Sequence, residues 1–95
     1  MEKYSDWDAE IYRSGLIELA EKLGIEVRRE ILGDEEAVVK SGLAYVDGKP
    51  ILFLDKRISS RETVAVLIRE LKGFPMEDVY IRPALRRLLL PEQED

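Results

Sequence analysis

The stretch GLAYVDGKPILFLD, residues 42–55, decides the fold of this chain. Asp47-Gly48 separates two runs rich in β-forming residues, and this dipeptide is typical of a type I′ hairpin turn. The run ILFL, Ile51–Leu54, is apolar on both faces, as in a central strand covered on at least one side. The sequence therefore predicts a β-hairpin whose second strand forms the centre of the fold, with Phe53 in the core.

A helix is expected before the hairpin, over about residues 5–23. Its apolar residues recur at helical spacing and form one stripe: Tyr12, Leu16, Leu19, Ala20 and Leu23. Ser5 and Asp8 have capping-box spacing, and Gly24 stands where a left-handed C-cap belongs. Gly15 costs about 1 kcal/mol relative to alanine inside a helix. Tertiary packing must therefore hold this helix.

Two further helices are expected after the hairpin. Ser59 and Glu62 form a capping box for the first, and Gly73 ends it. Its sheet-facing residues are Val64, Leu67, Ile68 and Leu71. A last short helix begins near Pro83, which suits a first turn, and stops at Pro91. Its apolar side consists of Ile81, Leu85, Leu88 and Leu89.

The segment IEVRREI, residues 25–31, completes the set of elements. Ile25, Val27 and Ile31 are in phase two, which predicts a half-buried strand. We therefore expect an α+β fold in the order helix, strand, strand, strand, helix, helix, with a three-stranded, largely antiparallel sheet and helices packed on it. Residues 1–95 are expected to form a single domain, with a flexible acidic tail at 91–95.

The composition narrows the possible chemistry. The 95 residues are 45% hydrophobic, enough for a core, and include no histidine and no cysteine. Histidine is the most frequent general base, and histidine and cysteine supply most zinc ligands, so we expect no catalytic site, metal or cofactor. No apolar run approaches the roughly 20 residues of a membrane span, and the acidic N-terminus is unlike a signal peptide. We expect a cytoplasmic protein without a membrane partner.

Three segments, GIEVRRE, GKPILFLD and RETVAVLIRELKG, resemble the core of the ImmA/IrrE-type zinc peptidase-like domains. In that family an inward strand precedes a helix that carries the motif H-E-x-x-H. The resemblance places the two histidine positions at Arg69 and Gly73, and the catalytic glutamate at Glu70. It implies a degenerate domain that has lost its metal and its peptidase activity. Alternatively, Arg69 and Glu70 are the exposed side of an ordinary core helix. The chain is also similar to small bacterial proteins, which implies no activity.

Two weaker motifs have ordinary explanations. The acidic loop GDEEA, residues 33–37, could bind a divalent cation, but it lacks the alternating ligands of an EF-hand loop. Ser41 beside Lys40 could suggest a serine–lysine nucleophile. Adjacent residues of an extended chain point to opposite faces, so this pair lacks the required geometry. A solvated acidic loop is the better interpretation of GDEEA, and the serine–lysine pair would need help from elsewhere in the chain.

Charge is unevenly distributed along the chain. Residues 1–49 carry 7 basic and 12 acidic groups, whereas residues 50–90 carry 8 basic and 5 acidic groups. Candidate phosphate-contacting residues in the basic part are Arg57, Arg61, Arg69, Lys72, Arg82, Arg86 and Arg87. The net charge is −5, and the aromatic residues fall in acidic or core segments, unlike those of a typical nucleic-acid binder. A nucleic-acid partner is therefore not expected.

These observations favour a non-catalytic domain that acts through protein–protein contact, with a homodimer slightly preferred to a monomer. Leu88, Leu89 and Leu90 sweep about 200° around a helix, so Leu90 is expected to point away from the core. Leu90 and the edge of the sheet are the predicted contact surface. The alternative is an enzyme, or an inactive remnant of one, that uses carboxylates such as Glu70.

Overall fold

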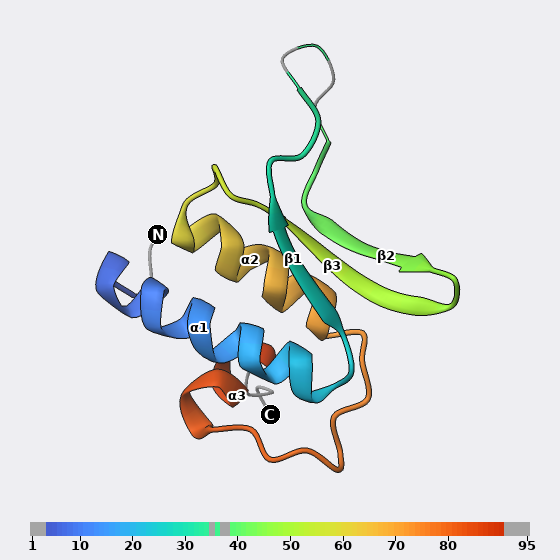
Figure 1. Cartoon of the computed structure of the whole chain (residues 1–95). Helices are drawn as coiled ribbons and strands as arrows, with labels where there is room; N and C mark the ends of the chain where they lie inside the picture. Colours follow the sequence, from blue (N-terminus) through green and yellow to red (C-terminus); the bar gives the residue numbers. More distant parts are fainter. Residues whose placement is uncertain (1–3, 35, 37–38, 91–95) are drawn as a thin grey trace.

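Three helices and three strands follow one another in the predicted order in the computed structural model, which describes residues 4–34, 36 and 39–90 (Figure 1). Their bounds are α1 Asp6–Lys22, β1 Glu26–Glu30, β2 Gly42–Val46, β3 Lys49–Asp55, α2 Ser60–Leu71 and α3 Pro83–Leu89. They form a small α+β domain, as the sequence predicts. The acidic tail expected to be flexible, residues 91–95, lies outside the described residues.

The sheet is mixed rather than largely antiparallel, which corrects the sequence-based expectation. Its order is β1-β3-β2, so the strand that contains Ile51–Leu54 is central, as predicted. β3 pairs antiparallel with β2 and parallel with β1, with Glu26 opposite Ile51 and Glu30 opposite Asp55. β1 and β2 run in opposite directions, with one strand position between them. The tight hairpin then returns β3 into that gap, which makes it parallel to β1.

The hairpin turn has the geometry that its sequence predicts. Asp47 and Gly48 both have positive φ angles, 53° and 79°, as the two central residues of a type I′ turn require. The turn fixes the register between β2 and β3, so that Leu43 lies opposite Leu52. Both leucines therefore point to the same face of the sheet.

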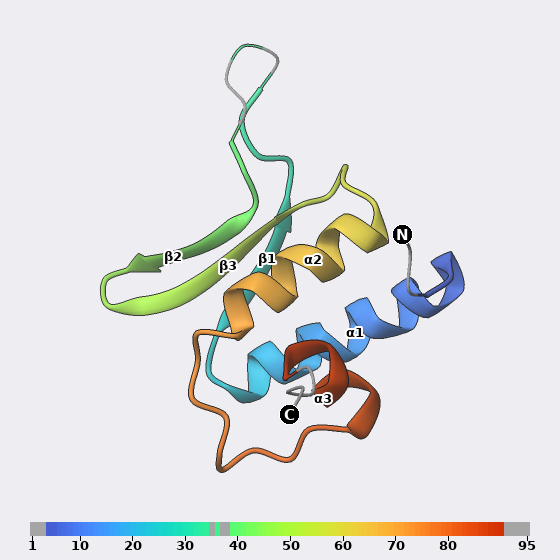
Figure 2. The same ribbon diagram turned by 180° about the vertical axis from the view of Figure 1, so that it is seen from behind.

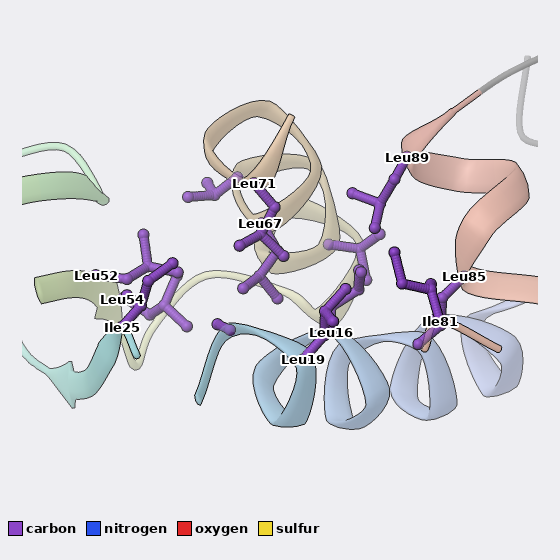
Figure 3. Close-up of a cluster of buried hydrophobic side chains, with 13 residues drawn as sticks. Leu16, Leu19, Ile25, Leu52, Leu54, Leu67, Leu71, Ile81, Leu85 and Leu89 are labelled. Carbon is purple, nitrogen blue, oxygen red and sulfur yellow. The ribbon is translucent and has the colours of Figure 1, made fainter. Parts of the chain in front are cut away.

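The molecule has three layers. α1 and α2 cover one face of the sheet, and α3 packs against these two helices on the side away from the sheet (Figures 1 and 2). The core consequently occupies two interfaces (Figure 3). Leu52 and Leu54 lie between the sheet and the pair α1 and α2, and Leu85 and Leu89 lie between this pair and α3. Leu67 lies between them and is fully buried.

Local signals explain the helix ends. Ser59 and Glu62 make both hydrogen bonds of a capping box at the start of α2, as predicted. At α1 the Ser5 hydroxyl accepts a hydrogen bond from the Asp8 N–H at 3.0 Å. Gly24 follows α1 with φ of 86°, which is the left-handed conformation expected of it.

Two details of the expected core are wrong. Ile31 lies beyond the end of β1 and is exposed. Phe53 is only half-buried, because side chains alternate along β3 and Leu52 and Leu54 occupy the helix-covered face. The Phe53 ring therefore lies on the other face, where the Arg28 guanidinium stands 5.9 Å from its centroid.

Candidate functional site

A groove runs along the outer side of α1, beside the start of α3. Its volume is about 720 Å³. The lining residues are Asp6, Trp7, Glu10, Ile11, Ser14, Gly15, Glu18 and Arg82. Trp7 is 75% exposed and Ile11 is 53% exposed. Two large apolar side chains on neighbouring turns of one helix thus face solvent beside a hollow, an arrangement that is typical of a contact surface.

α1 lies in the layer between the sheet and α3. Its buried stripe faces these neighbours, and the side of the helix that lines the groove remains open. Its main apolar stripe is buried, with Leu16 and Leu19 in the core. Trp7 and Ile11 lie outside that stripe, one turn apart. The next position in their row is Gly15, where a Cβ atom would lie 3.0 Å from Leu85 and 3.3 Å from a terminal nitrogen of Arg82. The lack of a side chain at Gly15 therefore lets α3 approach and form the wall of the groove.

A second, smaller hollow continues the first. It has a volume of about 250 Å³ and is lined by Gly15, Glu18, Leu19, Lys22, Tyr80, Ile81, Arg82 and Leu85. Gly15, Glu18 and Arg82 belong to both hollows, so the two are contiguous. The exposed Tyr80 adds a second aromatic ring, after Trp7, to the lining of these hollows.

Carboxylates stand along the rim, and each is already bonded within the molecule. Asp6 accepts a hydrogen bond from Arg61 at 2.8 Å, which ties the start of α1 to the start of α2. Glu10 accepts hydrogen bonds from Arg13 at 3.2 Å and from the Ser60 hydroxyl at 3.0 Å. These bonds direct both carboxylates to structural partners rather than toward each other across the groove. Both carboxylates therefore stabilise α1 itself and its contact with the start of α2.

Glu18 and Arg82 form the looser end of the rim. The closest approach of their side chains is 3.5 Å, and both side chains are largely exposed. An exposed pair at this distance contributes little to stability. The Arg82 guanidinium consequently remains available to contact a group that enters the groove.

The positions suggested by the peptidase resemblance lie elsewhere, near the C-terminal end of α2. Arg69 donates hydrogen bonds to the Glu70 carboxylate at 3.1 and 3.2 Å and to the Ser41 carbonyl at 3.1 Å. Glu70 is therefore held by an arginine beside the start of β2. Gly73 follows the helix. Within residues 4–34, 36 and 39–90, no three His, Cys, Asp or Glu residues are grouped closely enough to hold a metal ion.

The two weaker motifs are placed differently from each other. The Asp34 carboxylate accepts a hydrogen bond from the Glu36 N–H at 2.9 Å, while Glu35 lies outside the described residues. The Ser41 hydroxyl accepts a hydrogen bond from the Asp55 N–H at 2.8 Å, which supports the sheet. Lys40 is exposed at the preceding position.

Arg57 illustrates how the basic residues are used. Its guanidinium bonds both carboxylate oxygens of Asp55, at 2.9 and 2.7 Å, and the Leu32 carbonyl at 2.9 Å. These side-chain hydrogen bonds, with a further one from the Arg57 backbone N–H, hold the pKa of Asp55 well below its usual range. Burial opposes this shift and is outweighed. The pair thereby links the end of β3 to the segment after β1.

The seven basic candidates are divided over the molecule. Arg57 and Arg61 lie at the start of α2 and bond to Asp55 and Asp6, whereas Arg82, Arg86 and Arg87 belong to α3 or its cap. Asp6, the partner of Arg61, lines the same groove as Arg82, whereas Arg57 is bonded to Asp55 at the end of β3. Arg69 and Lys72 lie at the C-terminal end of α2.

The surface predicted for self-association is exposed. β2 forms one edge of the sheet, and its Tyr45 and Val46 are exposed. Leu90 follows α3 and is 47% exposed, whereas Leu89 is buried, so Leu90 points away from the core as predicted. Neither surface belongs to the groove along α1.

Comparison of the chain with models of protein families, with characterised proteins and with solved structures gives no match. Among the described residues, no helix combines the length and the apolar character that crossing a bilayer requires.

The groove is not among the features predicted from the sequence. Trp7, Ile11 and Gly15 recur at every fourth position, which is a second row beside the buried stripe. That row could have been recognised as a separate helical face. Arg82 could not have been added to it, because its place depends on how α3 packs against α1.

Proposed function

We propose that this protein is a non-catalytic contact domain that binds another protein chain through the groove between α1 and α3. The observation that carries the proposal is the exposure of Trp7 and Ile11 on adjacent turns beside a hollow of about 720 Å³. Trp is among the residues that contribute most to binding at protein interfaces, because its ring buries a large area at small entropic cost. The compartment expected from the sequence, the cytoplasm, is kept in this proposal.

The shape of the groove suits a polypeptide better than a small molecule. Small-molecule sites enclose most of their ligand, whereas here the two largest lining side chains, Trp7 and Ile11, are mostly exposed to solvent. The apolar centre and the charged rim match the usual division of a protein interface into a hydrophobic core and a polar periphery. The alternative of an enzyme or enzyme remnant based on Glu70 has no comparable support, because Arg69 occupies that carboxylate.

Site-specific photo-crosslinking tests the proposal. A benzophenone amino acid at Ile11, in the organism that encodes the chain, is expected to give a discrete protein adduct. The same amino acid at Lys56, which is exposed between β3 and α2, is the matched control and is expected to give none. Trp7→Ala should abolish the adduct at position 11. Equal labelling at both positions, or an adduct at Lys56 alone, would contradict the proposal.

A further inference from the structure

The two edges of the sheet differ in charge. β1 forms one edge, and four of its five residues are charged: Glu26, Arg28, Arg29 and Glu30. β2 forms the other edge, and its sequence, GLAYV, contains no charged residue. Charged side chains on an edge strand hinder pairing with another chain, to which the outer backbone groups of the strand would otherwise bond. β1 is therefore protected against strand addition, whereas β2 lacks this protection.

The register of the hairpin determines which backbone groups of β2 point outward. Val46 and Lys49 form the first pair beside the two-residue turn, and the groups of every second residue from there point to β3. Ala44 is one of these inward residues. Leu43 and Tyr45 therefore direct their N–H and C=O groups away from β3, to the outer edge of the sheet. Among the residues that the structure describes, no backbone group outside the sheet bonds to them.

Arg69 marks one end of this outer edge. Its guanidinium donates a hydrogen bond to the Ser41 carbonyl at 3.1 Å, two residues before Leu43 and on the same side of the strand. The other end is open, because the hairpin turn extends beyond β1 and the helices (Figures 1 and 2). An added strand would therefore meet two donors and two acceptors, one of each from Leu43 and from Tyr45.

We infer that a second copy of this chain pairs with β2 through its own β2, in antiparallel orientation about a two-fold axis at Ala44. In this register Leu43 of each copy lies opposite Tyr45 of the other, and all the outward groups of both residues are bonded. The edge is its own complement under this symmetry, as an isologous contact requires. The contact lies outside the groove and does not depend on the proposed function.

The side chains of β2 match in this arrangement. Leu43 is half-buried and Tyr45 is 64% exposed, so each tyrosine ring packs against a leucine of the other copy. Cross-strand pairs that contain an aromatic ring stabilise antiparallel sheets. Ala44 faces its own copy at the axis, where the Cα atoms of a non-hydrogen-bonded pair are about 4.5 Å apart. A small side chain fits this close approach.

Charge is compatible with this orientation. Continuing the register places Asp47 of one copy opposite Ser41 of the other, beside the Arg69 guanidinium. This arginine is bonded to Glu70, but its side chain is 59% exposed and can contact a second carboxylate. A pairing of β1 with its copy would instead place charged residues along the whole contact.

Mass and tryptophan emission together locate the contact. Sedimentation equilibrium of the full chain from low micromolar to millimolar concentration should show a mass that rises from 11.0 kDa toward twice that value. Trp7, the single tryptophan, lies at the start of α1, on the opposite side of the molecule from β2 in Figures 1 and 2, so its emission should stay constant. An emission shift that follows the mass would overturn the inference. A mass that stays at 11.0 kDa would also overturn it, and would leave the edge to a strand of a different protein.

A disulfide tests the register, because the chain contains no cysteine. Two copies of Ala44→Cys would face each other at the axis, within the Cα separation of about 4.4–6.8 Å that a disulfide requires. Val46→Cys is the matched control at another exposed position of β2, and in this register its two copies are about 14 Å apart. Mild oxidation should therefore link the first variant and not the second. Equal linking of both variants, or of Val46→Cys alone, would contradict the register.

A charge exchange tests the two-fold symmetry. Ala44→Lys and Ala44→Glu each place like charges directly opposite one another, so each should weaken self-association at least about tenfold. An equimolar mixture of the two should recover it, because the mixed dimer joins opposite charges at the axis. Failure of the mixture to recover would overturn the inference.

Leu90→Glu is the control for the other surface predicted from the sequence. Leu90 is exposed and follows α3, which packs on the side of the helix pair away from the sheet, so this variant should leave the dimer unchanged. Loss of the dimer in Leu90→Glu, with Ala44→Lys unaffected, would assign the contact to α3 and overturn the inference. Far-ultraviolet circular dichroism of each variant separates loss of contact from loss of fold.

Discussion

Asp55 holds the end of β3 through a carboxylate that accepts hydrogen bonds from Arg57. Its pKa in the folded protein lies below the ordinary value of 3.8. The carboxylate is charged in both the folded and the unfolded chain above about pH 5. As the pH falls through about 4, the unfolded chain takes up the proton first, so the stability supplied by this group is lost with decreasing pH.

Asp55→Asn should therefore destabilise the protein at neutral pH, and the difference from wild type should shrink as the pH drops below about 4. Urea unfolding at pH 7 and at pH 3 measures both quantities. Glu21→Gln, which removes an exposed carboxylate of α1, is the control and should give a small difference at pH 7. An Asp55→Asn difference that is as large at pH 3 as at pH 7 would contradict the assigned role.

Neighbouring residues of β3 should respond very differently to truncation. Leu52 is fully buried between the sheet and the helices, so Leu52→Ala should cost about 2–5 kcal/mol of unfolding free energy. Phe53 is half-buried on the other face beneath Arg28, so Phe53→Ala should cost only about 1–2 kcal/mol. Urea melts of the two variants provide the comparison. An equal or larger loss for Phe53→Ala would show that its face is covered in solution.

At the scale of elements, Gly15 sets the distance between α1 and α3. Helix propensity alone predicts that Gly15→Ala stabilises the protein by about 1 kcal/mol. The new methyl group would lie 3.0 Å from Leu85, however, and the packing conflict should cancel that gain. Ser14→Ala, at an exposed position on the same turn, should show the smaller gain of about 0.5 kcal/mol that helix propensity predicts for replacing serine.

A double-mutant cycle with Leu85→Ala isolates this conflict. Removal of the Leu85 side chain gives the added methyl group space, so Gly15→Ala should become stabilising in that background. Thermal or urea unfolding of the four proteins yields the coupling free energy. Additive effects would mean that α1 and α3 separate easily, and that Gly15 has no role in their approach.

At the scale of the whole molecule, the fold does not depend on the groove. The layers are joined through Leu16, Leu67 and Leu89, while Trp7 stands mostly in solvent. Trp7→Ala should therefore change the unfolding free energy of the monomer by no more than about 0.5 kcal/mol. The measurement is urea unfolding at low micromolar concentration. A larger loss would assign Trp7 to folding rather than to contact.

The sequence could predict the elements of this molecule because their signals are local. The Asp47-Gly48 turn, the Ser59–Glu62 capping box and the apolar run of β3 each depend on residues within a few positions of one another. The direction of β1 relative to β3 could not be predicted in this way. It depends on whether one strand position or none separates β1 from β2, which is a property of the whole sheet rather than of a short stretch of sequence.

The groove was harder to predict than the sheet. The α1 side of the groove can be recognised in the sequence, as the row that contains Trp7, Ile11 and Gly15. Its other side exists only because α3 folds back beneath the helix pair, which brings Arg82 beside residues more than sixty positions earlier in the chain. Periodicity in the sequence can identify a row of exposed apolar residues. The wall that α3 forms beside this row depends on tertiary packing.

The mixed sheet has a kinetic consequence. The first pair of the hairpin, Val46 and Lys49, is 3 positions apart in the sequence, whereas Glu26 and Ile51 of the parallel pair are 25 apart. Closing the larger loop costs more entropy, so the hairpin should form in the folding transition state and β1 should dock after it. Gly48→Ala, at a φ of 79°, should then slow refolding, whereas Val27→Ala should mainly accelerate unfolding in stopped-flow experiments. The parallel strand would thus join the sheet last and leave it first.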